Sequence, residues 1–120
     1  MQPHTRAILA ASAYALVTGK KVVGLYDHAR GAHLRVAAEA RGEHLQGYDG
    51  DREARFGGTL PELRDTGDGG SSVHMEIEGA AAKGYDRRSS GHFTAEVAER
   101  LVQLYDYAEE AWFTFDVRVA

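Results

Sequence analysis

A unit that recurs at spacings of 22, 37 and 20 residues constrains this sequence more than any other feature. Each copy contains an apolar run, a Tyr-Asp dipeptide, four loop residues and a second strand of alternating apolar residues. Period-two alternation within a short repeat predicts a β-hairpin that is used several times. The four dipeptides are Tyr26-Asp27, Tyr48-Asp49, Tyr85-Asp86 and Tyr105-Asp106.

The spacing of 37 residues contains a degenerate fifth copy, in which Arg64 replaces the tyrosine and Asp65 follows it. This copy starts soon after Gly57 and Gly58, which leaves little room for a full strand before it. Pro61 fits only an edge or the start of a strand, because proline cannot donate a ladder hydrogen bond. We therefore expect an irregular crossing between the second hairpin and the degenerate one.

Pairing each tyrosine with the residue seven positions later leaves a four-residue loop and defines the register of every hairpin. On the inner face, Gly47 then lies opposite Phe56 and Gly84 opposite Phe93, so each ring can cover a strand glycine. In the first hairpin the same register turns Val23 inward. The register and the apolar face agree, which supports an antiparallel pairing throughout.

The Tyr-Asp dipeptide has a structural interpretation. The aspartate opens each loop, where its carboxylate can accept hydrogen bonds from backbone N–H groups of the turn. The recurring dipeptide resembles the YD repeats of Rhs-type shell proteins. The Gly-Arg-Leu that usually follows it in that family is absent here, and the loops are longer, so no fold or function is carried over.

The segment before the first hairpin predicts a helix over residues 4–19, ended by Gly19 as its C-terminal cap with Lys20 and Lys21 beside the last carbonyls. It is rich in alanine and apolar all round. A helix of this kind is normally covered on most sides, by a sheet or by a second copy of itself. Its apolar stretch is too short to cross a bilayer, which takes about 20 residues.

These elements predict a mainly β protein with one domain over residues 1–120, made of the helix at 4–19 and hairpin repeats at 20–119. Short links between hairpins favour an antiparallel meander of about nine or ten strands. A meander of this length curls into a barrel or into two layers, with the Ala-rich helix packed on its apolar face. The sequence leaves the choice between barrel and layers open.

Composition excludes several classes of function. The chain has no cysteine, which rules out disulfides, thiolate metal sites and a cysteine nucleophile, and we expect a cytoplasmic location. Secretion through an atypical N-terminal signal stays open, because Ala7 to Val17 has the outline of a short apolar region. A net charge of -4 argues against a nucleic-acid partner, and we expect no membrane partner.

The outward face is where a function is most easily carried. The register pairs each tyrosine with histidine, arginine or tryptophan, and Tyr107 adds another ring in the last loop. Rows of this kind anchor protein contacts, although they also occur as ordinary cross-strand pairs. The predicted interaction surface consists of Tyr26, His33, Tyr48, Arg55, Tyr85, His92, Tyr105, Tyr107 and Trp112.

Other chemistry is only weakly indicated. His74, Glu76 and Glu78 share one strand face, but metal sites need three or four convergent ligands. The carboxylates of residues 49–53 resemble the start of a calcium loop without its later ligands. Ser89 and Ser90 lie near His92 with no orienting acid. We therefore predict no catalytic residue, no metal site and no cofactor.

The sequence favours a non-enzymatic interaction or structural module that forms a homo-oligomer or binds a protein partner. The alternative is a barrel-like carrier of an apolar small molecule, with room near Gly47, Gly58, Gly84 and Ala95. A metal- or His/Asp-dependent enzyme is the third hypothesis. It requires three of the histidines to converge in one cleft with carboxylates, out of His28, His33, His44, His74 and His92.

Overall fold

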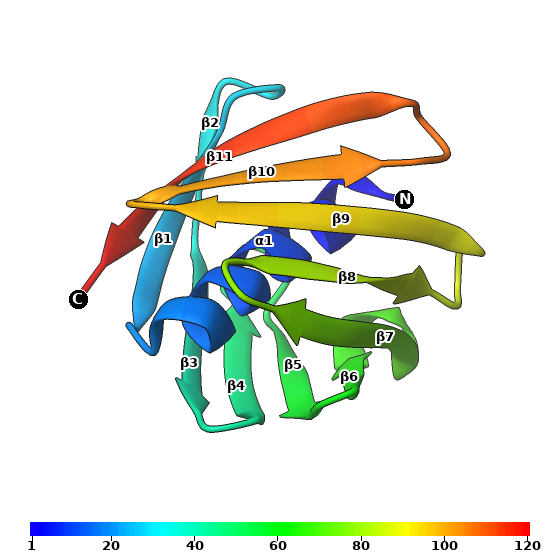
Figure 1. Ribbon diagram of the computed structural model, residues 1–120, viewed down its shortest axis with the longest axis horizontal. Coiled ribbons are helices and arrows are strands. Elements are labelled where there is room, and N and C mark those ends of the chain that lie inside the picture. The colour runs from blue at the N-terminus through cyan, green and yellow to red at the C-terminus, as the bar shows by residue number, and fades with distance from the viewer.

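Eleven antiparallel strands form one sheet that closes into a ten-stranded barrel, with the N-terminal helix packed on it (Figure 1). The computed structural model describes residues 1–120 apart from the side chain of Asp68. Neighbouring strands follow chain order almost throughout, and the last strand pairs with the first to close the barrel. The elements are α1 (Pro3–Thr18), β1 (Val22–Asp27), β2 (Ala32–Leu34), β3 (Val36–Arg41), β4 (His44–Asp49), β5 (Ala54–Thr59), β6 (Glu62–Asp65), the 3-10 turn η1 (Thr66–Asp68), β7 (Ser71–Glu78), β8 (Ala81–Asp86), β9 (Gly91–Ala98), β10 (Leu101–Asp106) and β11 (Ala111–Val119).

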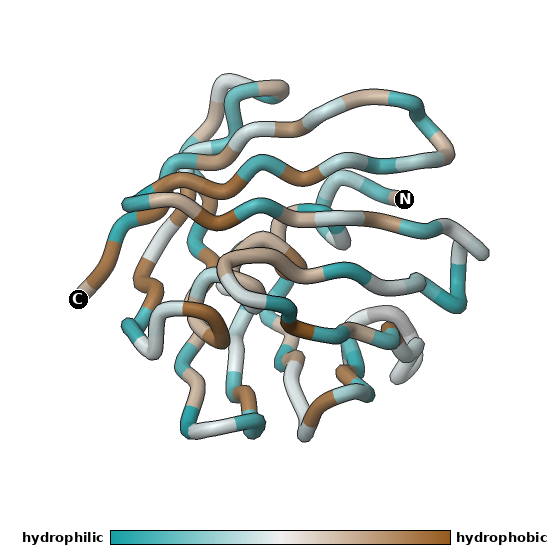
Figure 2. Tube along the Cα trace, viewed as in Figure 1, coloured by the Kyte–Doolittle hydropathy of each residue, from teal (hydrophilic) through white to brown (hydrophobic). Residues whose placement is uncertain are grey.

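The predicted register is confirmed in the three hairpins β4–β5, β8–β9 and β10–β11. Tyr85 lies opposite His92, and Gly84 lies opposite Phe93. The alternation of apolar and polar residues along β9 and β10 is visible in Figure 2. A Cβ on Gly84 would overlap the backbone carbonyl of His74 and also come within 2.9 Å of the Phe93 ring. The phenylalanine therefore covers a place where no other side chain fits.

The first hairpin departs from the repeat, and the inward placement of Val23 was wrong. Leu25 pairs with Leu34 as predicted, but Val22 pairs with Ala38, which is a different register. The pairing of β1 with β11 also shifts between Val22 and Gly24, which is a β-bulge. Val22 is therefore buried, whereas Val23 is 39% exposed. Strand pairing is interrupted at Arg35, so β2 and β3 are two separate segments that both pair with β1.

The crossing between the second and the degenerate hairpin is irregular, as expected, but it stays within the meander. Strands β5 and β6 pair antiparallel over only Phe56/Asp65 and Gly57/Arg64. Their turn contains a cis Leu60–Pro61 bond. Gly57 has a φ of 145°, a conformation that side chains rarely adopt, and a Cβ there would overlap the carbonyl of Leu45. The glycine thus permits the tight approach of β4.

Helix α1 is covered within the chain. The eleven residues from Thr5 to Ala15 are all buried, and they lie against strands from every part of the sheet, β1, β3, β4 and β7–β11. Figure 1 shows α1 between the group β8–β11 and the group β3–β5, which run in different directions. Ala10, Ala11, Ala13 and Ala15 have no exposed surface, so small side chains let a helix fit in the interior. The helix ends at Gly19, which is left-handed at φ 71°.

The loop-opening aspartates are buried, and their predicted role in the turns is confirmed. In each of the five loops the carboxylate accepts a backbone N–H from a residue two or three positions later. Arg30 and Arg52 each donate an Nε–H bond to Asp27 and Asp49, and the Ser89 hydroxyl donates to Asp86. The five residues are Asp27, Asp49, Asp65, Asp86 and Asp106.

Asp106 differs from its sister aspartates because it joins a hairpin to α1. Its Oδ2 lies 3.4 Å from Nη1 of Arg6 and 3.2 Å from the α-amino group of Met1. The Arg6 guanidinium also lies 3.7 Å from the centre of the Phe113 ring, in a cation–π contact. At the other end of the helix, the Tyr14 hydroxyl accepts a hydrogen bond from the backbone amide of Arg100. The helix is thus tied to the barrel at both ends.

The interruption at Arg35 is held by the neighbouring loop. Gly50 donates its N–H to the Arg35 carbonyl at 2.6 Å. The Arg35 amide and its Nε donate to the two oxygens of the Asp51 carboxylate, each at 3.0 Å. The backbone bond from Arg35, and next the side-chain bond, lower the pKa of Asp51 from its ordinary value of 3.8.

The stability that the Arg35–Asp51 contact contributes should be lost at acid pH. A carboxylate with a lowered folded-state pKa contributes stability above its unfolded pKa and loses it as the pH falls through the folded value. Asp51→Asn should therefore reduce stability only slightly at pH 7, because both partners are exposed, and have no effect well below the folded-state pKa. Calorimetric melts of both proteins at neutral and strongly acid pH measure this. An equal difference at both pH values would contradict the ionic origin.

Candidate interaction surface

Closure of the barrel wraps the predicted row of rings around the molecule, so its members face several directions. The four outward pairs that define it are all formed in the predicted register. Tyr48, Tyr107 and Trp112 are the exposed large rings, at 45%, 53% and 51%. Tyr48 lies opposite Arg55 on β4–β5. The row is therefore not one flat surface, and its parts have to be considered separately.

Three rings of the β10–β11 hairpin form what we call the ring cluster, defined as Tyr105 on β10, Tyr107 in the connecting loop and Trp112 on β11. The centre of the Tyr105 ring is 4.8 Å from that of Tyr107 and 5.1 Å from that of Trp112, both edge-to-face. The Tyr107 hydroxyl is 3.2 Å from the hydroxyl of Thr94 on β9. Mutual contact restricts these rings, so a partner would order them at a small entropic cost.

A shallow groove adjoins the ring cluster on the outer face of β7–β9. Its volume is about 510 Å³, and Tyr85, His92 and Tyr107 line it together with His74. The centres of the Tyr85 and His92 rings are 4.8 Å apart. The ring cluster and this groove together give β8–β11 the largest group of outward rings that the sequence predicted. The contact of Tyr107 with Thr94 was not predicted, because it crosses from one hairpin to the next.

The pair Tyr26/His33 lies elsewhere, at the seam where β1 meets β11. The Tyr26 ring centre lies 4.8 Å from that of His33 and 5.2 Å from that of His28, in both cases edge-on. His28 Nε2 is 3.1 Å from a carboxylate oxygen of Asp116. The sequence placed Tyr26 and His33 together but gave no sign of Asp116, which comes from the far end of the chain.

The five histidines that the enzyme hypothesis named lie in separate places. His28 and His33 flank Tyr26, His74 and His92 line the groove beside Tyr85, and a ring nitrogen of His44 lies 3.0 Å from the Thr59 hydroxyl. His74 lies 3.1 Å from Glu76, and its other ring nitrogen is 3.6 Å from Glu62. Among the described residues, no group of three or more His, Asp or Glu side chains is arranged to hold a metal ion.

The outer groups around His74 are instead linked as ion pairs. Arg87 binds Glu62, and this bond is the main cause that lowers the pKa of Glu62 from its ordinary value of 4.5. Lys83 pairs with Glu78 at 3.2 Å. Exposed pairs of this kind contribute little to stability. His74, Glu76 and Glu78 thus lie along one face of β7, as predicted, and Glu78 pairs with Lys83.

At the places where the sequence left room for an apolar ligand, neighbouring side chains and backbone lie close together. Ala95 is fully buried, the Gly47 site is covered by the Phe56 ring, and a Cβ on Gly58 would lie 2.7 Å from the carbonyl oxygen of Glu62. Helix α1 occupies the space between the sheet faces. In the part of the chain that the structure describes, every buried side-chain nitrogen and oxygen has a hydrogen-bond partner.

Comparison with models of known families, with curated proteins and with solved structures gives no match for this chain. The only helix among the described residues longer than a single turn, α1, falls short of the length and hydropathy needed to cross a bilayer. The fold defines the chain as a small closed antiparallel barrel with an internal helix. Its function has to be argued from the outer surface.

Proposed function

We propose that this chain is a non-enzymatic binding module, which contacts a protein through the ring cluster of the β10–β11 hairpin. The observation that carries the proposal is the half-exposed state of Tyr107 and Trp112, at 53% and 51%. The core beneath is filled by Phe115, Val102 and Leu104 without them. Tyrosine and tryptophan supply most of the binding energy at protein interfaces when they cluster in one place.

Self-association is the form of binding to test first, since it needs no partner beyond the chain itself. The loop that carries Tyr107 also carries Glu109 and Glu110, so acidic groups border the ring cluster. A different protein that presents an apolar patch with basic residues is the other form of partner. We propose the cytoplasm as the location, in keeping with a sequence that contains no cysteine.

Replacing both Tyr107 and Trp112 by serine tests the proposal. Loss of two central rings should weaken association by about 30-fold or more, since a single hot-spot residue contributes at least about 2 kcal/mol. Sedimentation velocity over a range of concentrations measures self-association, and pull-down on the immobilised chain measures a different partner. Both side chains are exposed, so the melting temperature should change little.

Tyr48→Ser is the matched control, because Tyr48 is similarly exposed but lies on β4, outside the ring cluster. It should leave both measurements unchanged. The proposal is wrong if the double variant sediments and captures protein as the parent does. It is also wrong if Tyr48→Ser has the larger effect, because the interface would then lie on β4–β5.

A further inference from the structure

The first hairpin is the place where the repeat is broken, and both irregularities lie beside one groove. The bulge in β1 moves Val23 to the surface and sets Gly24 opposite Arg118 of β11. The interruption at Arg35 separates β2 from β3. The other three Tyr-Asp hairpins keep their register. Bulges re-aim side chains, and departures from an otherwise consistent pattern occur mainly at functional sites.

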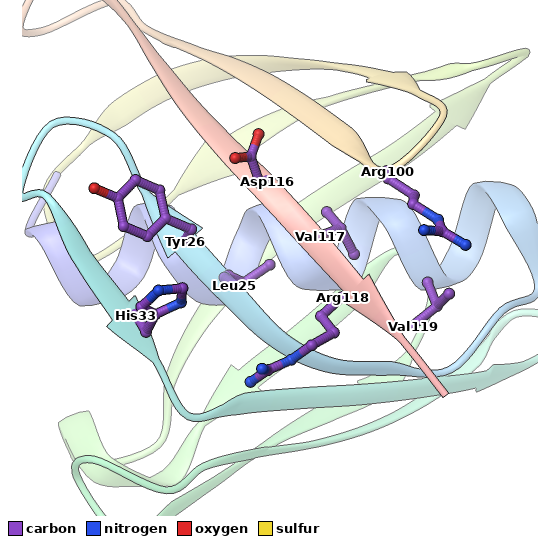
Figure 3. A pocket seen from close by; sticks show the side chains of 8 residues that line it. All are labelled: Leu25, Tyr26, His33, Arg100, Asp116, Val117, Arg118 and Val119. Carbon is purple, nitrogen blue, oxygen red and sulfur yellow. The ribbon is translucent and has the colours of Figure 1, made fainter.

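The groove lies on the outside of the seam between β1 and β11 and has a volume of about 480 Å³. We call it the seam groove (Figure 3). This volume lies within the range of roughly 300–1,000 Å³ that small-molecule sites occupy. Its residues are Leu25, Tyr26, His33, Arg100, Asp116, Val117, Arg118 and Val119. Tyr26, His33, Arg100, Asp116 and Arg118 supply its rings and charged groups, whereas the side chains of Leu25 and Val117 are buried.

The charge in the seam groove is unbalanced in favour of cations. Asp116 is the acidic group that lines it, and its carboxylate is already 3.1 Å from His28. The ion pairs among the described residues include neither Arg100 nor Arg118. Two guanidinium groups therefore line the groove without a carboxylate from this chain.

Gly24 leaves the space that the Arg118 side chain occupies. A Cβ at residue 24 would lie 2.7 Å from Nη2 and 3.2 Å from Nε of Arg118, so the guanidinium lies over the bare backbone of β1. Figure 3 shows Arg118 and His33 in the lower part of the view and Tyr26 above His33. A cation in a groove that two rings also line suits a ligand with one charged end and one apolar end.

We propose that the seam groove binds a small organic monocarboxylate with an apolar or aromatic body. The carboxylate pairs with Arg118, whose planar guanidinium can donate two parallel hydrogen bonds to it. The rings of Tyr26 and His33 flank the body. This binding activity is separate from the ring cluster and does not depend on it.

Titration of the full chain with phenylacetate, followed by amide chemical shifts, tests the site. Phenylacetamide has the same body without the charge, so it separates recognition of the carboxylate from contact with the ring. Phenylacetate should shift the amides of Tyr26, His33, Val117 and Arg118, and phenylacetamide should bind at least about tenfold more weakly, since a hydrogen bond to a charged group is worth about 1.5–3 kcal/mol.

Two variants assign the effect to Arg118. Arg118→Gln should reduce phenylacetate binding about tenfold and leave phenylacetamide binding unchanged, because only the charged contact is removed. Gly24→Ala should weaken phenylacetate in the same way by displacing the guanidinium. Arg55→Gln is the matched control, since Arg55 is also an exposed arginine next to a strand tyrosine. Unshifted amide spectra away from residues 24 and 118 show that each variant is folded.

Three outcomes would overturn the proposal. Phenylacetate and phenylacetamide binding with equal affinity would show that no cation recognises the carboxylate. A loss with Arg55→Gln that equals the loss with Arg118→Gln would show a nonspecific charge effect. Shift changes confined to residues outside the seam groove, or none at millimolar ligand, would show that the groove does not take such a ligand.

Discussion

Replacing Asp106 by alanine should lower the free energy of unfolding by about 3–5 kcal/mol, the usual cost of removing one partner from a buried ion pair. Asp106 has no exposed surface, and its loss leaves the buried Arg6 without its carboxylate. It also leaves the amides of Ala108 and Glu109 without their acceptor. Urea unfolding followed by circular dichroism measures the difference.

Asp27→Ala is the matched control, because Asp27 opens an equivalent turn and its carboxylate binds Ala29 and Arg30 of that turn, whereas Asp106 also binds Arg6 of α1. Its partner Arg30 is 42% exposed and can be solvated once the carboxylate is gone. We expect a cost of about 1 kcal/mol, the net value of an ordinary hydrogen bond. Equal costs at the two positions would mean that the tie between the barrel and α1 contributes nothing.

A double-mutant cycle with Arg6→Leu separates the ion pair from the turn. If the charge left behind causes the large loss, Arg6→Leu combined with Asp106→Ala should cost less than the sum of the two single changes. Additive costs would place the effect in the loop of residues 106–111 alone. The cation–π contact with Phe113 is lost in both backgrounds that carry Arg6→Leu, so it cancels in the cycle.

Gly84→Ala should destabilise the barrel by roughly 3 kcal/mol, near the upper end for overpacking a core. The added methyl group would overlap the carbonyl of His74, which belongs to the backbone of β7 and cannot rotate away. Strands β7 and β8 would have to separate along their ladder. Thermal unfolding, read through the near-ultraviolet signal, reports the change.

The same hairpin contains its own control at Gly91. There the nearest group to an added Cβ is the Ser89 hydroxyl at 3.1 Å, a side-chain atom and not backbone, and the sister copies already carry alanine at this position, as in Ala54. Gly91→Ala should therefore be neutral or add about 0.4–1 kcal/mol through the unfolded state. A loss at Gly91 as large as that at Gly84 would show that the cost does not come from the close approach of β7.

Residues near one another in sequence allowed the hairpins to be predicted. Cross-strand pairs such as Tyr85/His92 follow from side-chain volume and alternation within about twenty residues, and they were confirmed. The exposure of Val23 could not be predicted in this way. It depends on a bulge against β11, whose residues lie at the other end of the chain. The burial of the all-apolar helix could be predicted from its composition. Its position relative to the strands could not, because it depends on how all the strands are staggered when the barrel closes.

The two candidate sites, the ring cluster and the seam groove, differ in the same way: the first depends on residues near one another in sequence and the second on residues far apart. The outward placement of Tyr105 and Trp112 follows from the register of one hairpin, so the sequence located the ring cluster apart from its contact with Thr94. The seam groove was missed, although Tyr26 and His33 were recognised as a pair. Arg118 and Asp116 reach it only because the barrel closes, and no local pattern connects β1 with β11.

The closure of β11 on β1 has a consequence for how the chain folds. Until the last strand arrives, β1 has an unpaired edge and the apolar surface of α1 is open to solvent, so closure depends on contacts between residues far apart in the sequence. Proteins with such distant pairings fold slowly and pass through aggregation-prone intermediates. At high protein concentration, β11 of one molecule can complete the open edge of another. The seam that closes one barrel can therefore exchange strands between two.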